Sequence, residues 1–349
     1  MANTSLPPQF KKLVVQKLST KFRQSTAIET TPFPTSIKPT EVIVKNIFAG
    51  INASDINFTA GTYKKGVHPP FDCGFESIGR VVQCGEVAAG KHGFAVGDAV
   101  IAQAFGGFSE YQVVPSRSLK KAPSVDAHWL PLDLSRTTAS IALAEVVQPK
   151  KGEVALVTAA AGGTGQFAVQ LLKKHYGCTV VGTCSSEAKR DLLKRLGCDV
   201  VINYKTEDAS EVLTKTFPTG VNCVYESVGG AMMELALKHL ALRGRICTIG
   251  SISGYQDLSS WKEESKCTRV PIPSQLLMKS ASLRGFFLPH FQKYADAHFA
   301  QLVALHNQGV ISSNIDPKAF VGLESVSDAV DYLHSGQNVG KVVVKLADE

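Results

Sequence analysis

Apolar and polar positions alternate in a regular rhythm between residues 145 and 290. Short apolar runs, typical of buried strands, are separated by segments with the periodicity of amphipathic helices. Gly177, Gly197 and Gly244 stand where the C-caps of such helices are expected. Strands alternating with helices predict an α/β fold with a doubly wound, six-stranded parallel sheet. The predicted strands are 153–159, 179–184, 199–204, 221–228, 245–251 and 282–288, and the predicted helices are 165–176, 186–196, 207–217, 230–243 and 273–280.

The first 130 residues have a different pattern. Short β-rich runs separated by glycine and proline turns predict a mostly antiparallel β domain. The segment after residue 310 contains a predicted helix at 325–333 and a last predicted strand at 340–345. We expect this segment to return to the first domain. The predicted domains are therefore 1–144, completed by 310–349, and 145–309.

The segment 159–165 reads Ala-Ala-Ala-Gly-Gly-Thr-Gly and lies between a predicted strand and a predicted helix. The glycines permit a tight turn and a close approach of the backbone to a ligand, and the helix N-terminus offers free N–H groups to a pyrophosphate. The alternative is a structural turn of some other α/β protein. Because the strand–helix series continues far beyond it, we favour a dinucleotide site. Its residues are Gly162, Gly163, Thr164 and Gly165.

The end of the second predicted strand indicates which dinucleotide is bound. NAD-preferring folds place an acidic residue there to hold the ribose hydroxyls, whereas this chain has Gly182-Thr-Cys-Ser185. Ser185 followed one helical turn later by Lys189 suits a ribose 2′-phosphate, so we favour NADPH over NADH. The alternative is that the serines only cap the helix and Lys189 is solvated. Tyr204, after the third strand, is a candidate contact for the adenine side.

Composition and charge limit the class of protein. The 349 residues exceed one ordinary core, which favours two domains. The net charge of +7 is spread along the chain, so nucleic-acid binding is not expected. The eight cysteines form no Cys-x-x-Cys pair and are expected to be buried free thiols.

Targeting signals are weak. No apolar stretch is long enough to span a membrane, and the N-terminus has no signal-peptide core. Basic residues between 11 and 23 are compatible with an import peptide, but residues 13–15 favour a first strand. The final residues do not form a Ser-Lys-Leu address. We expect a cytoplasmic protein, and a peroxisomal location stays open.

Several segments together resemble the medium-chain dehydrogenase/reductase superfamily, in its zinc-independent quinone oxidoreductase and prostaglandin reductase branch. The resemblance covers nearly the whole chain and implies a GroES-like β-rich domain beside a Rossmann domain. It is carried by Gly50-Ile-Asn-Ala-Ser-Asp-Ile-Asn57, Val157-Thr-Ala-Ala-Ala-Gly-Gly-Thr-Gly-Gln166, Gly182-Thr-Cys-Ser-Ser186, Ile202-Asn-Tyr-Lys-Thr-Glu207, Val224-Tyr-Glu-Ser-Val-Gly-Gly-Ala231 and Ile249-Gly-Ser-Ile-Ser-Gly-Tyr-Gln256.

The resemblance also bears on metal binding. Zinc-dependent members carry a cysteine ligand in Gly-x-Cys and a histidine ligand in Gly-His-Glu. The matching positions here are Asn52, in Gly50-Ile-Asn52, and Phe75, in Gly74-Phe-Glu76. Neither side chain replaces a thiolate or an imidazole ligand, so we expect no metal.

The resemblance implies NADPH contacts and a mode of chemistry. Hydride would pass to the β-carbon of a conjugated enone, and the charge that develops on its carbonyl oxygen needs hydrogen-bond donors. The candidate donors, which are the candidate catalytic residues, are Tyr255, Asn52 and Tyr63. The contacts that the resemblance implies lie at Thr164, Ser185, Lys189, Tyr204, Ser227, Ile249, Tyr255, Phe286, Phe287, Leu288 and Asn338.

The acceptor and the oligomeric state stay open. Resemblance to prostaglandin reductases implies reduction of the 13,14 double bond of 15-keto-prostaglandins, with Trp261, Lys262, Lys266 and Arg269 as a candidate clamp for an acidic, lipid-derived substrate. The alternatives are a quinone or 2-alkenal reductase and, from another class, a cofactor-binding protein without turnover. Members of this branch are commonly homodimers, and we expect strand 282–288 to pair with a second copy.

Overall fold

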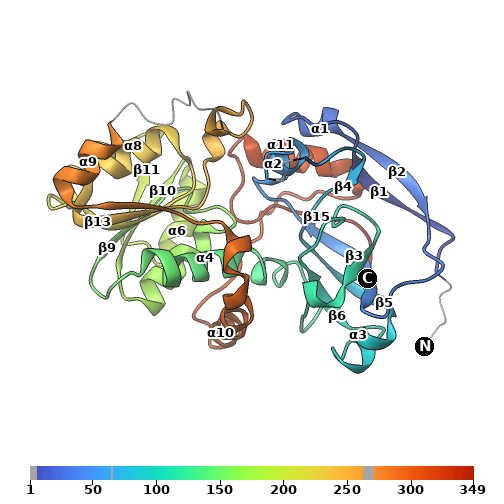
Figure 1. Cartoon of the computed structure of the whole chain (residues 1–349). Coiled ribbons are helices and arrows are strands. Elements are labelled where there is room, and N and C mark those ends of the chain that lie inside the picture. The colour runs from blue at the N-terminus through green and yellow to red at the C-terminus, as the bar shows by residue number, and fades with distance from the viewer. Residues whose placement is uncertain (1–5, 64–65, 262–270) are drawn as a thin grey trace. The chain divides into compact units, whose positions relative to one another are not determined.

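The computed structural model describes residues 6–63, 66–261 and 271–349. The chain divides into two compact units (Figure 1). Unit 1 contains Met1–Leu134, Ile315–Gln337 and Lys341–Glu349, and unit 2 contains Ser135–Asn314 and Asn338–Gly340. The functional division predicted from the sequence, 1–144 with 310–349 and 145–309, stays a prediction.

Unit 2 is built on a six-stranded sheet in the order β11-β10-β9-β12-β13-β14, and every neighbouring pair is parallel. The predicted doubly wound sheet is therefore confirmed. The strand order reverses between β9 and β12, where open α/β sheets bind ligands at the carboxyl ends of their strands. The strands are β9 (Val154–Val157), β10 (Thr179–Cys184), β11 (Val200–Asn203), β12 (Val221–Glu226), β13 (Leu240–Thr248) and β14 (Ser282–Gly285).

The helices of unit 2 follow the predicted rhythm with one clear exception. α6 ends at Gly197, whose φ of +106° is the left-handed conformation expected of a C-cap glycine. Gly244 is not a helix cap, because α8 ends at Lys238 and β13 already begins at Leu240. The helices are α4 (Ser135–Ile141), α5 (Gly165–Gln170, continued by a π-turn to His175), α6 (Glu187–Leu196), α7 (Ala209–Thr216), α8 (Gly230–Lys238), α9 (Ile272–Lys279) and α10 (Ala295–Asn307).

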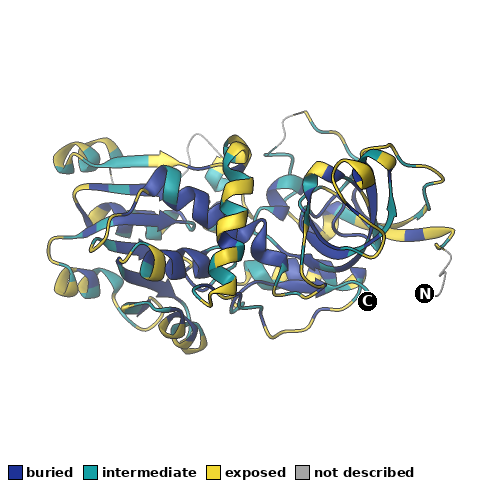
Figure 2. Ribbon diagram, turned by 90° about the horizontal axis from the view of Figure 1, so that it is seen from below, coloured by how far each residue is buried: buried dark blue, intermediate teal, exposed yellow. Residues whose placement is uncertain are grey.

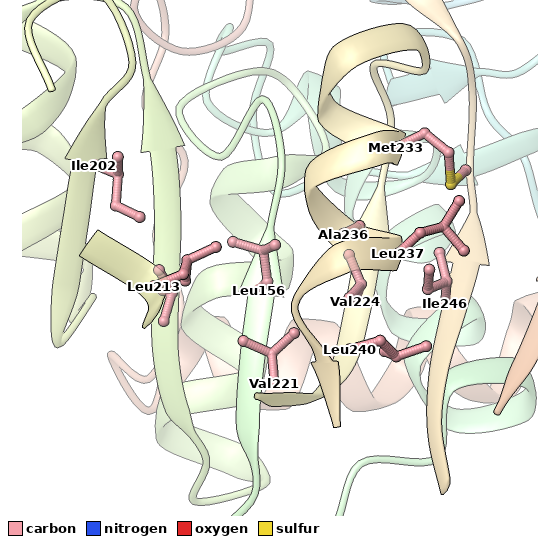
Figure 3. Close-up of a cluster of buried hydrophobic side chains, with 11 residues drawn as sticks. Leu156, Ile202, Leu213, Val221, Val224, Met233, Ala236, Leu237, Leu240 and Ile246 are labelled. Carbon is pink, nitrogen blue, oxygen red and sulfur yellow. The ribbon is translucent and has the colours of Figure 1, made fainter. Parts of the chain in front are cut away.

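One face of the parallel sheet carries an apolar core (Figure 3). Leu156, Val224 and Ile246 from neighbouring strands are at most 1% exposed. Leu213 of α7 and Leu237 of α8 cover them from the helical layer. Removing such side chains from water is the main favourable contribution to folding, so this layer fixes the strands whose ends carry the candidate site.

Unit 1 is the expected antiparallel β structure. Its larger sheet has the order β15-β3-β5-β6-β8, with β7 also pairing with β3, and a smaller sheet has the order β2-β1-β4. Buried residues follow the central strands of the larger sheet, whereas β2 of the smaller sheet is mostly exposed (Figure 2). The strands are β1 (Gln9–Val15), β2 (Thr26–Pro32), β3 (Glu41–Gly50), β4 (Phe71–Asp72), β5 (Ser77–Cys84), β6 (Ala99–Ala102), β7 (Tyr111–Pro115), β8 (Leu119–Lys121) and β15 (Val343–Lys345).

The late segments 315–337 and 341–349 belong to unit 1. They contribute α11 (Val326–His334) and β15, which is shorter than the predicted strand 340–345. The short helices of the first segment are α1 (Phe22–Ser25), α2 (Asp55–Thr59) and α3 (Glu86–Gly90). Within the described ranges, no helix has the length and apolar character needed to cross a membrane.

Candidate functional site

The glycine-rich turn between β9 and α5 is shaped by close packing. The left-handed residue of this turn is Ala159, with φ of +46°, and not a glycine. A Cβ atom on Gly165 would lie 2.4 Å from the carbonyl oxygen of Ala159, so only glycine fits there. Gly162 is less constrained, since its Cβ would lie 3.1 Å from the same oxygen. The glycines thus serve close approach more than unusual backbone angles.

The same turn presents a group of backbone donors. Within the described parts of the chain, the N–H groups of Gly163, Thr164 and Gly165 have no acceptor. The returning segment 338–340 belongs to this unit, and the Gly340 amide donates to the carbonyl oxygen of Ala161 at 2.9 Å. Asn338 is fixed beside it, because its Nδ2 donates to the Gly340 carbonyl at 2.9 Å. Unpaired amides at a helix N-terminus are an anion-binding arrangement.

The carboxyl ends of β10 and β11 bring the predicted phosphate contacts together. Lys189 Nζ donates to Ser185 Oγ at 3.1 Å, so the hydroxyl and the cation are adjacent. Ser186 caps α6 by accepting from the Lys189 backbone amide. Tyr204, 40% exposed, follows β11, and its amide donates to the carbonyl oxygen of Cys184 at 3.1 Å. These residues form one polar, accessible edge without a carboxylate at the end of β10.

The carboxyl ends of β12 and β13 carry the next group. The Ser227 amide donates to Thr158 Oγ1 at 2.9 Å, and the Ile249 amide donates to the Glu226 carbonyl at 2.7 Å. Tyr255 is 5% exposed, and its hydroxyl oxygen accepts from the Ser251 amide at 3.0 Å. The hydroxyl keeps its own proton for donation.

Phe286, Phe287 and Leu288 follow β14 and differ in their surroundings. The Phe286 amide donates to the Thr248 carbonyl at 3.0 Å, and its buried ring stacks on Phe291 with centroids 4.8 Å apart. Leu288 is also buried, whereas Phe287 is 37% exposed. Only Phe287 therefore presents its side chain to solvent within this segment. Trp261 stacks on Tyr255, with centroids 6.3 Å apart, whereas Lys262, Lys266 and Arg269 lie outside the described residues.

Asn52 belongs to a buried polar cluster in unit 1. Its Nδ2 donates to the Gly50 carbonyl at 3.2 Å and to Glu76 Oε2 at 3.1 Å, and its Oδ1 accepts from Lys341 Nζ at 2.7 Å. Both amide protons of Asn52 are thus used inside the unit. Asp55 accepts from the Asn52 backbone amide at 2.8 Å, and burial raises the pKa of its carboxyl to about 7.

The residues Glu76, Asp55 and Lys341 were not among the predicted site residues. Lys341 lies 289 positions after Asn52, and nothing in the local pattern of either segment indicates that they meet. A signal was available in the sequence: Lys341 stands directly before the apolar run Val342-Val-Val344. A charged residue in such a position predicts a buried charge with a partner elsewhere in the chain.

Tyr63 and Phe75 meet in an aromatic group. Phe58 lies at its centre, with ring centroids 5.1 Å from Tyr63, 4.7 Å from Phe75 and 4.9 Å from Phe105. Phe105 is 45% exposed and the others are partly buried. Phe75 immediately precedes Glu76, and Phe58 shares α2 with Asp55, so this aromatic group adjoins the buried polar cluster.

This arrangement does not fit a zinc ion. Asn52 holds a lysine ammonium, and Phe75 packs among aromatic rings. An ammonium in contact with the same groups would repel a divalent cation. Across the residues that the structure describes, no three His, Cys, Asp or Glu side chains are grouped so as to hold a metal.

Comparison with known proteins identifies the family of this chain. Residues 38–124 match the sequence model of the alcohol dehydrogenase GroES-like domain, and residues 163–304 match that of the zinc-binding dehydrogenases. The chain is 48% identical to a probable quinone oxidoreductase of Leishmania amazonensis, over 98% of this chain and 99% of that protein. It is 45% identical to prostaglandin reductase-3 of Mus musculus, over 98% and 91%.

A solved structure extends the comparison to three dimensions. A mycobacterial protein in complex with NADPH has a TM-score of 0.81 and 26% identity, covering 96% of this chain and 99% of that one. Relatives of this identity match along nearly the whole length of both proteins. The chain belongs to the medium-chain dehydrogenase/reductase superfamily, in its quinone oxidoreductase and prostaglandin reductase branch.

Proposed function

We propose that this protein is an NADPH-dependent reductase of conjugated enones or quinones. The observation that carries the proposal is the edge of unit 2, where free amides at 163–165 and the Ser185–Lys189 pair follow neighbouring parallel strands. Amides there suit a pyrophosphate, and the hydroxyl–ammonium pair suits a ribose 2′-phosphate. The names of the relatives, quinone oxidoreductase and prostaglandin reductase, support the reaction class.

The residues divide the remaining tasks. NADPH, when bound, supplies a hydride for the β-carbon of the acceptor. Of the candidate donors we favour Tyr255 for a developing oxyanion, because its hydroxyl only accepts, from the Ser251 amide, and can still donate a hydrogen bond. Asn52 donates both amide protons within unit 1, to Gly50 and Glu76. Its contribution to the reaction would therefore come from the fixed orientation of its amide dipole. Phe58, Phe75 and Tyr63 offer apolar surface for a conjugated acceptor, which aligns the reacting carbon.

Steady-state turnover tests this proposal. NADPH oxidation would be followed with a 15-keto-prostaglandin, a 2-alkenal and an ortho-quinone in parallel, with NADH as the cofactor control. We propose the 13,14 double bond of the prostaglandin as the preferred acceptor, in line with the name of the mouse relative. Activity confined to the quinone would favour the quinone reductase alternative, in line with the Leishmania relative. Tight NADPH binding without turnover of any acceptor would contradict the enzyme proposal and favour a binding protein.

Lys189→Ala is expected to lower kcat/KM for NADPH by roughly ten-fold and to leave the value for NADH nearly unchanged. The reason is the loss of a charge-assisted hydrogen bond, worth about 1.5 kcal/mol, to a phosphate that NADH lacks. The matched control is Lys194→Ala, an exposed lysine on the same helix. Equal losses for both cofactors would contradict the assignment.

We further propose that the protein forms a homodimer through β14. This strand ends the sheet, and its last two residues are exposed, so its edge is free to pair. Leu277 and Met278 of the preceding helix are 77% and 79% exposed, an apolar surface that a second copy would cover. Light scattering should give twice the monomer mass for the wild type. The double variant Leu277→Lys/Met278→Lys should give a lower mass. A monomeric wild type would overturn the proposal. The cytoplasmic location stays a prediction.

A further inference from the structure

The ammonium of Lys341 is a buried cation at the centre of the polar cluster in unit 1. Its Nζ lies 2.5 Å from Glu76 Oε2 and 2.7 Å from Asn52 Oδ1, and the two charged side chains are 2% and 1% exposed. Gly50 makes room for the pair, because a Cβ on it would lie 2.2 Å from Glu76 Oε2 and 3.0 Å from Lys341 Cε. The backbone is therefore shaped around this ion pair.

Burial of these charges is not explained by stability. Moving two ions out of water costs several kcal/mol per ion, and an apolar pair of similar volume is often as stable. The lysine instead determines the orientation of an amide. Because Oδ1 of Asn52 accepts from Lys341, its Nδ2 must face Gly50 and Glu76. Asn52 is the partly exposed member of this cluster, whereas Lys341 and Glu76 are buried.

The third N–H of Lys341 has no acceptor among the described residues. Because the ammonium is paired with the Glu76 carboxylate, what it gives Asn52 is a fixed hydrogen bond to Oδ1 and not a net positive charge. In a reaction that builds negative charge on a carbonyl oxygen, a dipole held in a preorganised orientation lowers the barrier.

We infer that Lys341 is a positioning residue for acceptor turnover, which acts through Asn52 by fixing the orientation of its amide. The inference rests on the proposed reductase function. It assigns the lysine to the acceptor step and not to NADPH binding, since the residues proposed to hold NADPH belong to unit 2.

The test compares Lys341→Met with the double variant Glu76→Gln/Lys341→Met. The single variant leaves an uncompensated carboxylate and is expected to unfold easily. The double variant removes both charges and should recover the melting temperature. In the double variant we expect kcat for the acceptor to fall roughly 10- to 100-fold, less than the roughly 100- to 1,000-fold loss of a direct oxyanion donor because Lys341 acts only through Asn52. We expect the NADPH dissociation constant to change less than two-fold. Lys91→Met, an exposed lysine of the same unit, is the matched control.

Two results would overturn the inference. One is a double variant that is as active as the wild type, which would make the pair structural. The other is an Asn52→Ala variant with unchanged kcat, because Lys341 is argued to act through that amide. The Asn52→Ala measurement tests the inference even if the double variant does not fold. An inactive wild type that binds NADPH would instead refute the proposed function and is distinguishable from both results.

Discussion

Gly165→Ala is expected to weaken NADPH binding by roughly 100-fold. The added Cβ would lie 2.4 Å from the Ala159 carbonyl oxygen and 2.9 Å from the Cα of Ala160. These are backbone atoms, so the turn must move to relieve the overlap. Overpacking of this kind costs about 1–3 kcal/mol, and here it displaces the free amides on which the proposed pyrophosphate site depends. Fluorescence titration with NADPH measures the effect.

Gly90→Ala is the control for this substitution. Nothing lies within 4 Å of a Cβ at that position, which is in α3 of unit 1. We expect Gly90→Ala to bind NADPH like the wild type. If Gly165→Ala also bound normally while its melting temperature fell, the close approach at residue 165 would serve packing alone, and the placement of the pyrophosphate would have to be revised.

Asp55→Asn is expected to change the pH dependence of stability by about 4 kcal/mol. The pKa of Asp55 is raised from 3.8 to about 7, chiefly by burial. Between those pH values the unfolded chain loses this proton and the folded chain keeps it. The stability contributed by this group is therefore fully present below pH 4 and is lost as pH rises to about 7. At about 1.36 kcal/mol per pKa unit, the loss is of that order.

Asparagine has no proton to lose, so the variant should gain stability relative to wild type as pH rises from 4 to 8. Denaturant unfolding at a series of pH values measures the difference. Asp98→Asn is a control of opposite sign, because the pKa of Asp98 is lowered: burial alone would raise it, but the hydrogen bonds from Lys121 and the Ala95 amide outweigh burial. A flat difference between Asp55→Asn and wild type would show that Asp55 ionises normally in the folded state.

The parallel sheet could be predicted from the sequence because the signals of its strands and helices are local. Buried strands and amphipathic helices each show their period within a dozen positions, and Gly197 marks a helix end by a conformation that favours glycine. Gly244 was also predicted to be a helix C-cap from its local pattern, and this prediction was wrong. Its neighbours suggested a helix end, but β13 starts at Leu240, and the left-handed residue is Arg243 with φ of +58°. Tertiary pairing of β13 with β12 outweighed the local pattern.

The residues at the ends of β10 and β11 and the buried polar cluster of unit 1 differ in the same way. Ser185 and Lys189 are four residues apart on either side of the N-cap of α6, so their meeting is a local feature of the helix start. Lys341, Glu76 and Asn52 come from distant segments, and no periodicity relates them. Asn52 was singled out by resemblance alone, and its two engaged amide protons could be seen only in three dimensions.

The distance along the chain between Asn52 and Lys341 has a consequence for biosynthesis. At about 5–20 residues per second, the 289 positions between them take on the order of 15 to 60 s to translate. For most of that interval Glu76 and the strands beside it exist without the lysine that neutralises this carboxylate, and a buried carboxylate without a partner is strongly unfavourable. We therefore expect the N-terminal unit to complete its packing only after residue 341 has been translated, unlike an N-terminal domain that folds first on the ribosome. Until then, we expect the strands around Glu76 to remain incompletely packed.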